Sequence, residues 1–155
     1  MSLRKELGDF SSIVCFKTVI TGVEDTLGPE GAAVVFIRAG KVRGRNLADS
    51  LGLTGKNVPA DQLAQALDNA VGANGTKLCR VTGAALDGET IIVRTNETVC
   101  SAGEPAGSTR QCTFTLGAVW GALEAVTGKT YEGSHTESVL RGGQSDTFVF
   151  HPTRN

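Results

Sequence analysis

The sequence predicts an α+β fold, in which an antiparallel sheet of about four strands is covered by helices. Two observations carry this prediction. Apolar residues recur every three or four positions over 13–71 and again over 112–127, a spacing typical of helices. Two pairs of strand-like segments are each divided by a turn dipeptide, Asp87-Gly88 in the first pair and Gly142-Gly143 in the second.

The first helix is expected to start after Ser11 or Ser12, because a serine side chain can accept a hydrogen bond from the free amides of the first turn. Gly28 is expected to end it. Its apolar positions form one stripe: Ile13, Phe16, Ile20, Val23 and Leu27.

Two more helices are expected in the N-terminal half. Pro29 suits the first turn of a second helix, because proline has no backbone donor to lose there. The run 32–37 could also be a buried strand, but the helical spacing continues beyond it, with a break expected near Gly40. Pro59 opens a third helix, which Gly72 ends.

The C-terminal half is expected to hold two hairpins with one long helix between them. Residues 77–86 and 89–95 form the first hairpin, and 130–141 and 145–152 form the second. The apolar helix covers 112–127 and follows a long polar loop.

Chain length and net charge limit the number of domains and the kinds of partner that we expect. The chain has 155 residues, within the usual range of about 100–200 for one domain, so we expect a single domain over 1–155. Fifteen Lys and Arg against sixteen Asp and Glu leave a net charge of -1, which gives no reason to expect nucleic acid as a partner. No apolar run is long enough for membrane insertion, and the first ten residues do not read as a secretory signal. We therefore expect a cytoplasmic protein with four free thiols.

The stretch 96–150 resembles the 4-vinyl-reductase-like domain, also called the hydrocarbon-binding domain. The resemblance rests on a fixed order of acidic, cysteine, glycine and aromatic residues: Glu97, Cys100, Cys112, Gly117, Gly121, Glu137, Phe148 and Phe150. It implies the fold of the TRAPP trafficking subunits and of the sensory domains of activators of aromatic catabolism. It also implies that an apolar or aromatic small molecule binds between helices and sheet.

Five apolar residues are expected to line or adjoin one enclosed cavity for such a ligand: Phe16, Phe36, Phe114, Trp120 and Leu123. Gly117, Gly121 and Ala125 lie four residues apart, so another backbone or a flat ligand could approach their face of the helix closely. The alternative is that the aromatic residues simply fill the core.

The resemblance also implies a zinc site that joins the start of the long helix to the final hairpin. The candidates here are Glu97, Cys100, Cys112 and Glu137. The two hairpin positions at which a cysteine is expected hold Leu140 and Phe148, which leaves too few ligands for a structural zinc site. We therefore expect no metal, no stoichiometric zinc and no other cofactor.

The sequence favours a binding protein over an enzyme, because it holds no nucleotide-binding fingerprint and only two histidines. The first hypothesis is a stand-alone module that senses or carries an apolar ligand. The alternatives are an accessory factor that presents a tetrapyrrole precursor to a separate reductase, and a structural adaptor of the trafficking type with a vestigial pocket. A homodimer is expected through the first helical stripe, unless that stripe faces the protein's own core.

Overall fold

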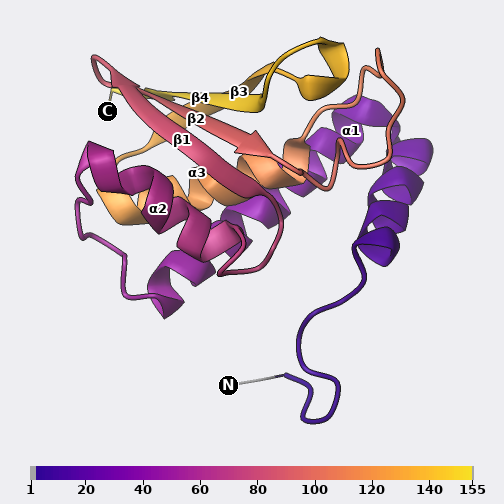
Figure 1. Cartoon of the computed structure of the whole chain (residues 1–155), viewed down its shortest axis with the longest axis horizontal. Helices are drawn as coiled ribbons and strands as arrows, with labels where there is room; N and C mark the ends of the chain where they lie inside the picture. Colours follow the sequence, from indigo (N-terminus) through magenta and orange to yellow (C-terminus); the bar gives the residue numbers. More distant parts are fainter. Residues whose placement is uncertain (1–2, 155) are drawn as a thin grey trace.

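The computed structural model describes residues 3–154 and confirms the α+β prediction (Figure 1). The elements follow one another as α1 (Ile13–Ser50), α2 (Ala60–Val71), β1 (Arg80–Asp87), β2 (Thr90–Asn96), α3 (Thr113–Thr127), β3 (Tyr131–Glu137), η1 (Val139–Arg141) and β4 (Asp146–Pro152). The four strands form one antiparallel sheet in the order β1-β2-β4-β3. Helices α2 and α3 lie on one side of this sheet, and α1 packs along α3 (Figure 1).

Helix α1 contains both of the first two predicted helices, with a break where they were expected to meet. Gly28 has φ 74° and ψ 164°, which is not helical, and Pro29 follows it. Only glycine adopts such a backbone conformation without strain. Ser12 caps the first segment, because its Oγ accepts a hydrogen bond from the Val14 amide at 3.2 Å. The predicted break near Gly40 was wrong, since the helix continues through this residue.

The two helices α1 and α3 are in close contact through their glycines. A Cβ on Gly40 would overlap the Phe114 carbonyl oxygen, and one on Gly44 would overlap that of Ala118. From the other side, a Cβ on Gly117 or Gly121 would overlap backbone carbonyl oxygens of α1. The smooth stripe on α3 therefore holds another backbone, one of the two occupants considered from the sequence.

The other predicted elements are present, but β1 begins at Arg80 and not at residue 77, and the last hairpin also differs. Pro59 and Gly72 flank α2 as predicted, and Gly88 turns the first hairpin with φ 60°. In the second hairpin, Val139–Arg141 is a short 3₁₀ turn and not part of a strand. Ser138 caps this turn by accepting a hydrogen bond from the Leu140 amide at 3.1 Å, which diverts the backbone from strand pairing.

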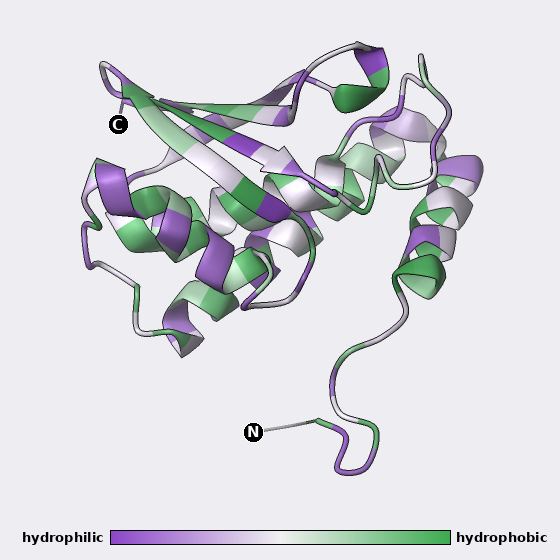
Figure 2. Ribbon diagram, viewed as in Figure 1, coloured by the Kyte–Doolittle hydropathy of each residue, from purple (hydrophilic) through white to green (hydrophobic). Residues whose placement is uncertain are grey.

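The core lies between the sheet and the helices. Helix α3 is mostly apolar, whereas α2 has both a hydrophilic and a hydrophobic face (Figure 2). The first helical stripe also contributes, since Ile20 is only 2 % exposed and Phe16 and Val23 pack against the core. The prediction that this stripe forms a dimer interface was therefore wrong for Ile20. Within residues 3–154, no helix combines the length and the apolar character needed to cross a membrane.

We predict that Gly44→Ala lowers the free energy of unfolding by about 1–3 kcal/mol, because its methyl group would overlap the Ala118 backbone and force α1 and α3 apart. Urea denaturation measures this change. The matched control is Gly22→Ala, at a position of α1 with open space around it, which should stabilise the protein by roughly 0.5–1 kcal/mol through helix propensity. Equal stability of Gly44→Ala and wild type would show that the two backbones do not need this close contact.

Candidate functional site

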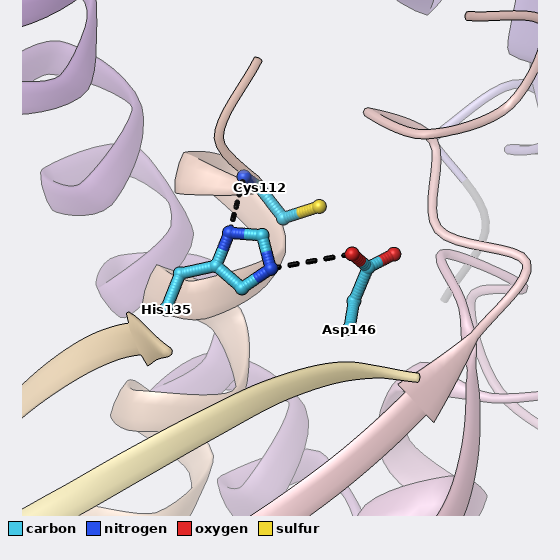
Figure 3. A group of neighbouring side chains, drawn as sticks. All are labelled: Cys112, His135 and Asp146. Carbon is cyan, nitrogen blue, oxygen red and sulfur yellow. Dashed lines mark hydrogen bonds and ion pairs between the residues drawn. The ribbon is translucent and has the colours of Figure 1, made fainter. Parts of the chain in front are cut away.

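Three side chains with metal-ligating atoms converge beside the start of α3 (Figure 3). Cys112 is the N-cap residue of α3, His135 belongs to β3, and Asp146 begins β4. The thiol sulfur, one imidazole nitrogen and one carboxylate oxygen all lie within 4.8 Å of one another. His135 Nε2 is 3.2 Å from Asp146 Oδ1, and the two side chains are 3 % and 0 % exposed. We call these three residues the Cys–His–Asp cluster.

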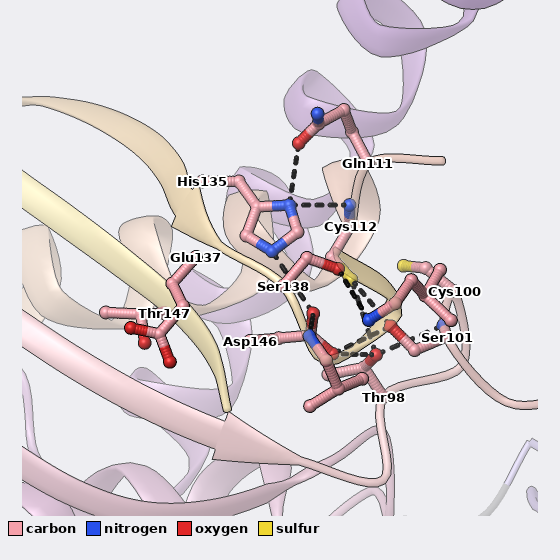
Figure 4. Close-up of polar contacts among 12 residues, drawn as sticks. Thr98, Cys100, Ser101, Gln111, Cys112, His135, Glu137, Ser138, Asp146 and Thr147 are labelled. Carbon is pink, nitrogen blue, oxygen red and sulfur yellow. Dashed lines mark hydrogen bonds and ion pairs between the residues drawn. The ribbon is translucent and has the colours of Figure 1, made fainter. Parts of the chain in front are cut away.

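Asp146 accepts hydrogen bonds on both carboxylate oxygens (Figure 4). Its Oδ2 accepts from the hydroxyls of Thr98 at 3.0 Å and Ser101 at 2.7 Å, and its Oδ1 accepts from the Val139 amide at 3.4 Å. Burial opposes the charge, but hydrogen bonds from His135, Ser101 and Thr98 outweigh it and lower the pKa of Asp146 to about 2. Ionised Asp146 therefore stabilises the fold at neutral pH, and this contribution is lost as the pH falls from the ordinary value of 3.8 through about 2.

Two hydroxyl oxygens lie close to the Cys112 sulfur. Thr98 Oγ1 lies 3.3 Å and Ser101 Oγ 3.7 Å from Cys112 Sγ. A hydrogen bond from the Cys100 thiol lowers the pKa of Cys112, and the same hydrogen bond together with burial raises the pKa of Cys100. Cys112 is thus the cysteine of this pair that carries a thiolate more readily, which is the form that binds metals.

His135 is held from both ring nitrogens. The Cys112 amide donates to Nδ1 at 3.3 Å, and Gln111 Oε1 lies 2.7 Å from the same nitrogen. On the opposite side of the ring, Nε2 lies 3.2 Å from Asp146 Oδ1, and it donates to this carboxylate when it carries the proton. Phe148 supports the ring from the neighbouring strand, with the two centroids 5.3 Å apart.

Lys17 of α1 holds the turn at residues 98–102, which supplies the hydroxyl groups of Thr98 and Ser101. Its ammonium donates to the carbonyl oxygens of Val99, Cys100 and Ala102 at 3.2, 2.6 and 2.9 Å. It also forms an ion pair with Glu104 at 3.0 Å. A lysine has three donors, so the three carbonyl oxygens alone can use all of them, and these bonds fix the turn against α1.

The Cys–His–Asp cluster fits the zinc ion that the resemblance implies. Sulfur, imidazole nitrogen and carboxylate oxygen are the three ligand types that zinc uses, and three protein ligands leave one position for a fourth. Cys112, His135 and Asp146 would hold the ion, and Thr98 and Ser101 would orient the carboxylate. Bound zinc would supply a cross-link between the start of α3 and the final hairpin.

Of the metal candidates named from the sequence, only Cys112 belongs to this cluster. Cys100 is outside the cluster: its sulfur lies 3.9 Å from Thr115 Oγ1, and the neighbouring Cys112 raises its pKa. Glu137 instead accepts from the Gln144 amide at 3.0 Å, with its carboxylate pointing away from the cluster (Figure 4), and Glu97 is exposed. His135 and Asp146 were missed.

His135 and Asp146 were missed because the ligand positions of the final hairpin were expected at Leu140 and Phe148. Leu140 and Phe148 are buried apolar residues, and the hairpin side chains that face Cys112 are His135 and Asp146. The available signal was His135 itself, one of only two histidines in the chain. The 3₁₀ turn that sets the position of Asp146 could not be seen in the strand pattern.

The five predicted ligand-binding residues lie in three different surroundings. Phe16 and Phe114 meet edge to face, 5.0 Å apart, in a surface hollow of about 700 Å³. Trp120 lines a second hollow of about 880 Å³ between α1 and β3. Phe36 and Leu123 are buried in the core.

We predict that the protein binds one cobalt(II) ion with a thiolate-to-cobalt absorption band, and that Cys112→Ser abolishes this band because it removes the sulfur ligand. An absorbance titration measures both. The control is Cys15→Ser, at an exposed position on α1. Absence of the band in the wild type would contradict the fit, and elemental analysis of the purified protein separately tests the sequence-based prediction that no stoichiometric zinc is present.

Comparison with known proteins supports the fold. No family model and no curated protein matches the sequence. Among solved structures, the phenol-responsive sensory domain of the transcription activator PoxR, bound to phenol, is similar with a TM-score of 0.70 and 17 % identity over 93 % of this chain and 76 % of that one. A trafficking protein particle complex subunit 3 from Naegleria fowleri, covalently bound to palmitic acid, matches with a TM-score of 0.60 and 13 % identity over 92 % and 95 %. At such low sequence identity, the structural similarity shows only that the chain shares the fold of these two proteins.

Proposed function

We propose that this chain is a 4-vinyl-reductase-like domain that binds an apolar or aromatic small molecule and has no catalytic activity of its own. The observation that carries the proposal is the hollow at Phe16 and Phe114. Two neighbours of the same fold were solved with small molecules, phenol in one and palmitic acid in the other. These neighbours support ligand binding as the general role.

The hollow has the features of a site for a small aromatic molecule. Its volume of about 700 Å³ falls within the range of about 300–1,000 Å³ that ligand pockets usually occupy. Phe16 of α1 and Phe114 of α3 contact each other at an interplanar angle of 82°. Phe10 forms part of the wall, with the Lys77 ammonium 5.6 Å from its ring. Apolar walls and a few charged groups at the margin are typical of such sites.

The hollow is next to the Cys–His–Asp cluster in the sequence and in space. Phe114 lies in the first turn of α3, and Cys112 is the N-cap of the same helix. The cluster therefore fixes the end of the helix that supplies one wall of the hollow. Phe36 and Leu123 were also predicted to bind the ligand. They are core residues, and we propose that they support α1 and α3 behind the hollow.

We predict that a neutral aromatic probe, 2-naphthol, binds this hollow and that Phe114→Ala weakens its binding about tenfold, because the ring contributes contact area and edge-to-face geometry. Isothermal titration calorimetry measures the affinity. Val139→Ala, at an exposed site in the final hairpin, is the control. If 2-naphthol does not bind the wild type, or binds Phe114→Ala as tightly, the hollow is not the ligand site.

We further propose a homodimer through the outer face of α1. Val35 and Ala39 are exposed one turn apart on this face, and exposed apolar residues that share a helix face often mark interfaces. Sedimentation equilibrium should give twice 16.1 kDa for the wild type and the monomer mass for Val35→Glu. Val14→Glu, on an exposed position nearer the start of α1, should remain dimeric. A monomeric wild type would overturn the dimer and leave the ligand proposal untouched.

A further inference from the structure

We propose that the hollow between α1 and the edge strand β3 is a second binding site, and that its ligand is an apolar monocarboxylate. This hollow measures about 880 Å³ and shares no lining residue with the hollow at Phe16 and Phe114. It therefore goes beyond the proposed aromatic site.

One wall of the hollow is a preorganised apolar surface. Trp120 is fixed in three ways: its Nε1 donates to Glu124 at 2.9 Å, its ring meets Phe150 at 6.3 Å, and the Lys41 ammonium lies 4.0 Å from its centroid. Ile37 and Val34 of α1 add aliphatic surface. A ring that is already held in place loses little conformational entropy when a ligand packs against it.

The edge strand allows the ring to reach this position. A Cβ on Gly133 of β3 would overlap the rings of both Phe150 and Trp120. Because this residue has no side chain, Trp120 packs directly beneath the strand and forms the floor where α1 and β3 come together. The hollow is therefore built from conformationally restricted elements and not from a loop.

The other wall is positively charged. Arg38, Lys41 and Arg45 follow one another at intervals of three and four residues, so they share one face of α1 and all line the hollow. Glu124 forms ion pairs with two of them, with its carboxylate 3.1 Å from Lys41 Nζ and 2.7 Å from Arg45 Nη2. The Arg38 side chain forms no hydrogen bond or ion pair within residues 3–154, although its guanidinium has five donors.

The charge balance selects a singly charged anion. Three cations face Glu124 and the exposed Glu132 of β3, which leaves one net positive charge around the hollow. His151 also lines it, and its Nδ1 is hydrogen-bonded to Thr90 at 3.0 Å. A dianion such as a phosphate monoester would be repelled by the two glutamates. A carboxylate matches the planar guanidinium of Arg38 with two parallel hydrogen bonds. An apolar body then packs against Ile37, Val34 and the part of the Trp120 ring that Lys41 leaves uncovered.

The only tryptophan of the chain lies in this hollow, so its fluorescence reports binding directly. We expect octanoate to change Trp120 fluorescence saturably and to bind about tenfold more tightly than 1-octanol, which has the same chain length without the charge. Arg38→Gln should remove this preference and leave the affinity for 1-octanol unchanged. Arg80→Gln, on an exposed position of β1, should bind octanoate like the wild type.

Three outcomes would overturn the carboxylate site: no saturable fluorescence change, equal binding of octanoate and 1-octanol, or the same loss of octanoate affinity in Arg80→Gln as in Arg38→Gln. Circular dichroism of Arg38→Gln checks that the variant is folded. Calorimetry with 2-naphthol separates this site from the aromatic one, because Arg38→Gln should leave 2-naphthol binding unchanged and Phe114→Ala should leave octanoate binding unchanged. Failure of either site is thus recognised without the other.

Discussion

The close packing of α1 against α3 is the constraint on which the other parts of the structure depend. Gly40 and Gly44 on one helix and Gly117 and Gly121 on the other bring the two backbones into contact. Each glycine in a helix interior lowers helix stability by roughly 0.5–1 kcal/mol relative to alanine. That cost is offset here because the two helices approach closely enough for backbone atoms to pack in place of side chains.

Helix α3 then acts as the common support for the candidate sites. Its N-cap, Cys112, belongs to the Cys–His–Asp cluster, and Phe114 in its first turn forms a wall of the aromatic hollow. Six residues after Phe114, Trp120 reaches the edge strand, and Glu124, four residues later, forms ion pairs with the cations of α1. A displacement of α3 along α1 would therefore alter both hollows and the cluster together.

The Cys–His–Asp cluster shows how buried polar groups are kept in this fold. An isolated buried carboxylate is unfavourable, but Asp146 is surrounded by the hydroxyls of Thr98 and Ser101, the His135 ring and a backbone amide. Lys17 holds the turn that carries two of these donors. The network joins α1, the turn after β2, and both strands of the last hairpin, so it stabilises contacts between segments that are far apart in the sequence.

The sequence by itself determined most of the elements and those boundaries that lie at glycine or proline, because these follow from local chemistry. The break at Gly28, the flanking residues Pro59 and Gly72, and the turn at Gly88 each reflect a backbone preference of the residue concerned. The α+β class followed from the order of helical and strand periodicities. Even the glycine stripe of α3 was visible as a surface for close approach.

Only the tertiary structure decided which side chains meet. His135 and Asp146 are eleven residues apart, and they face Cys112 because a bulge in β3 and the 3₁₀ turn before β4 set the offset of the hairpin. A shift of one residue in a strand turns a side chain to the other face of the sheet, so strand periodicity could not specify this pairing. The same holds for Trp120 and Phe114, which both lie on α3 but face different hollows, because α1 crosses the helix between them.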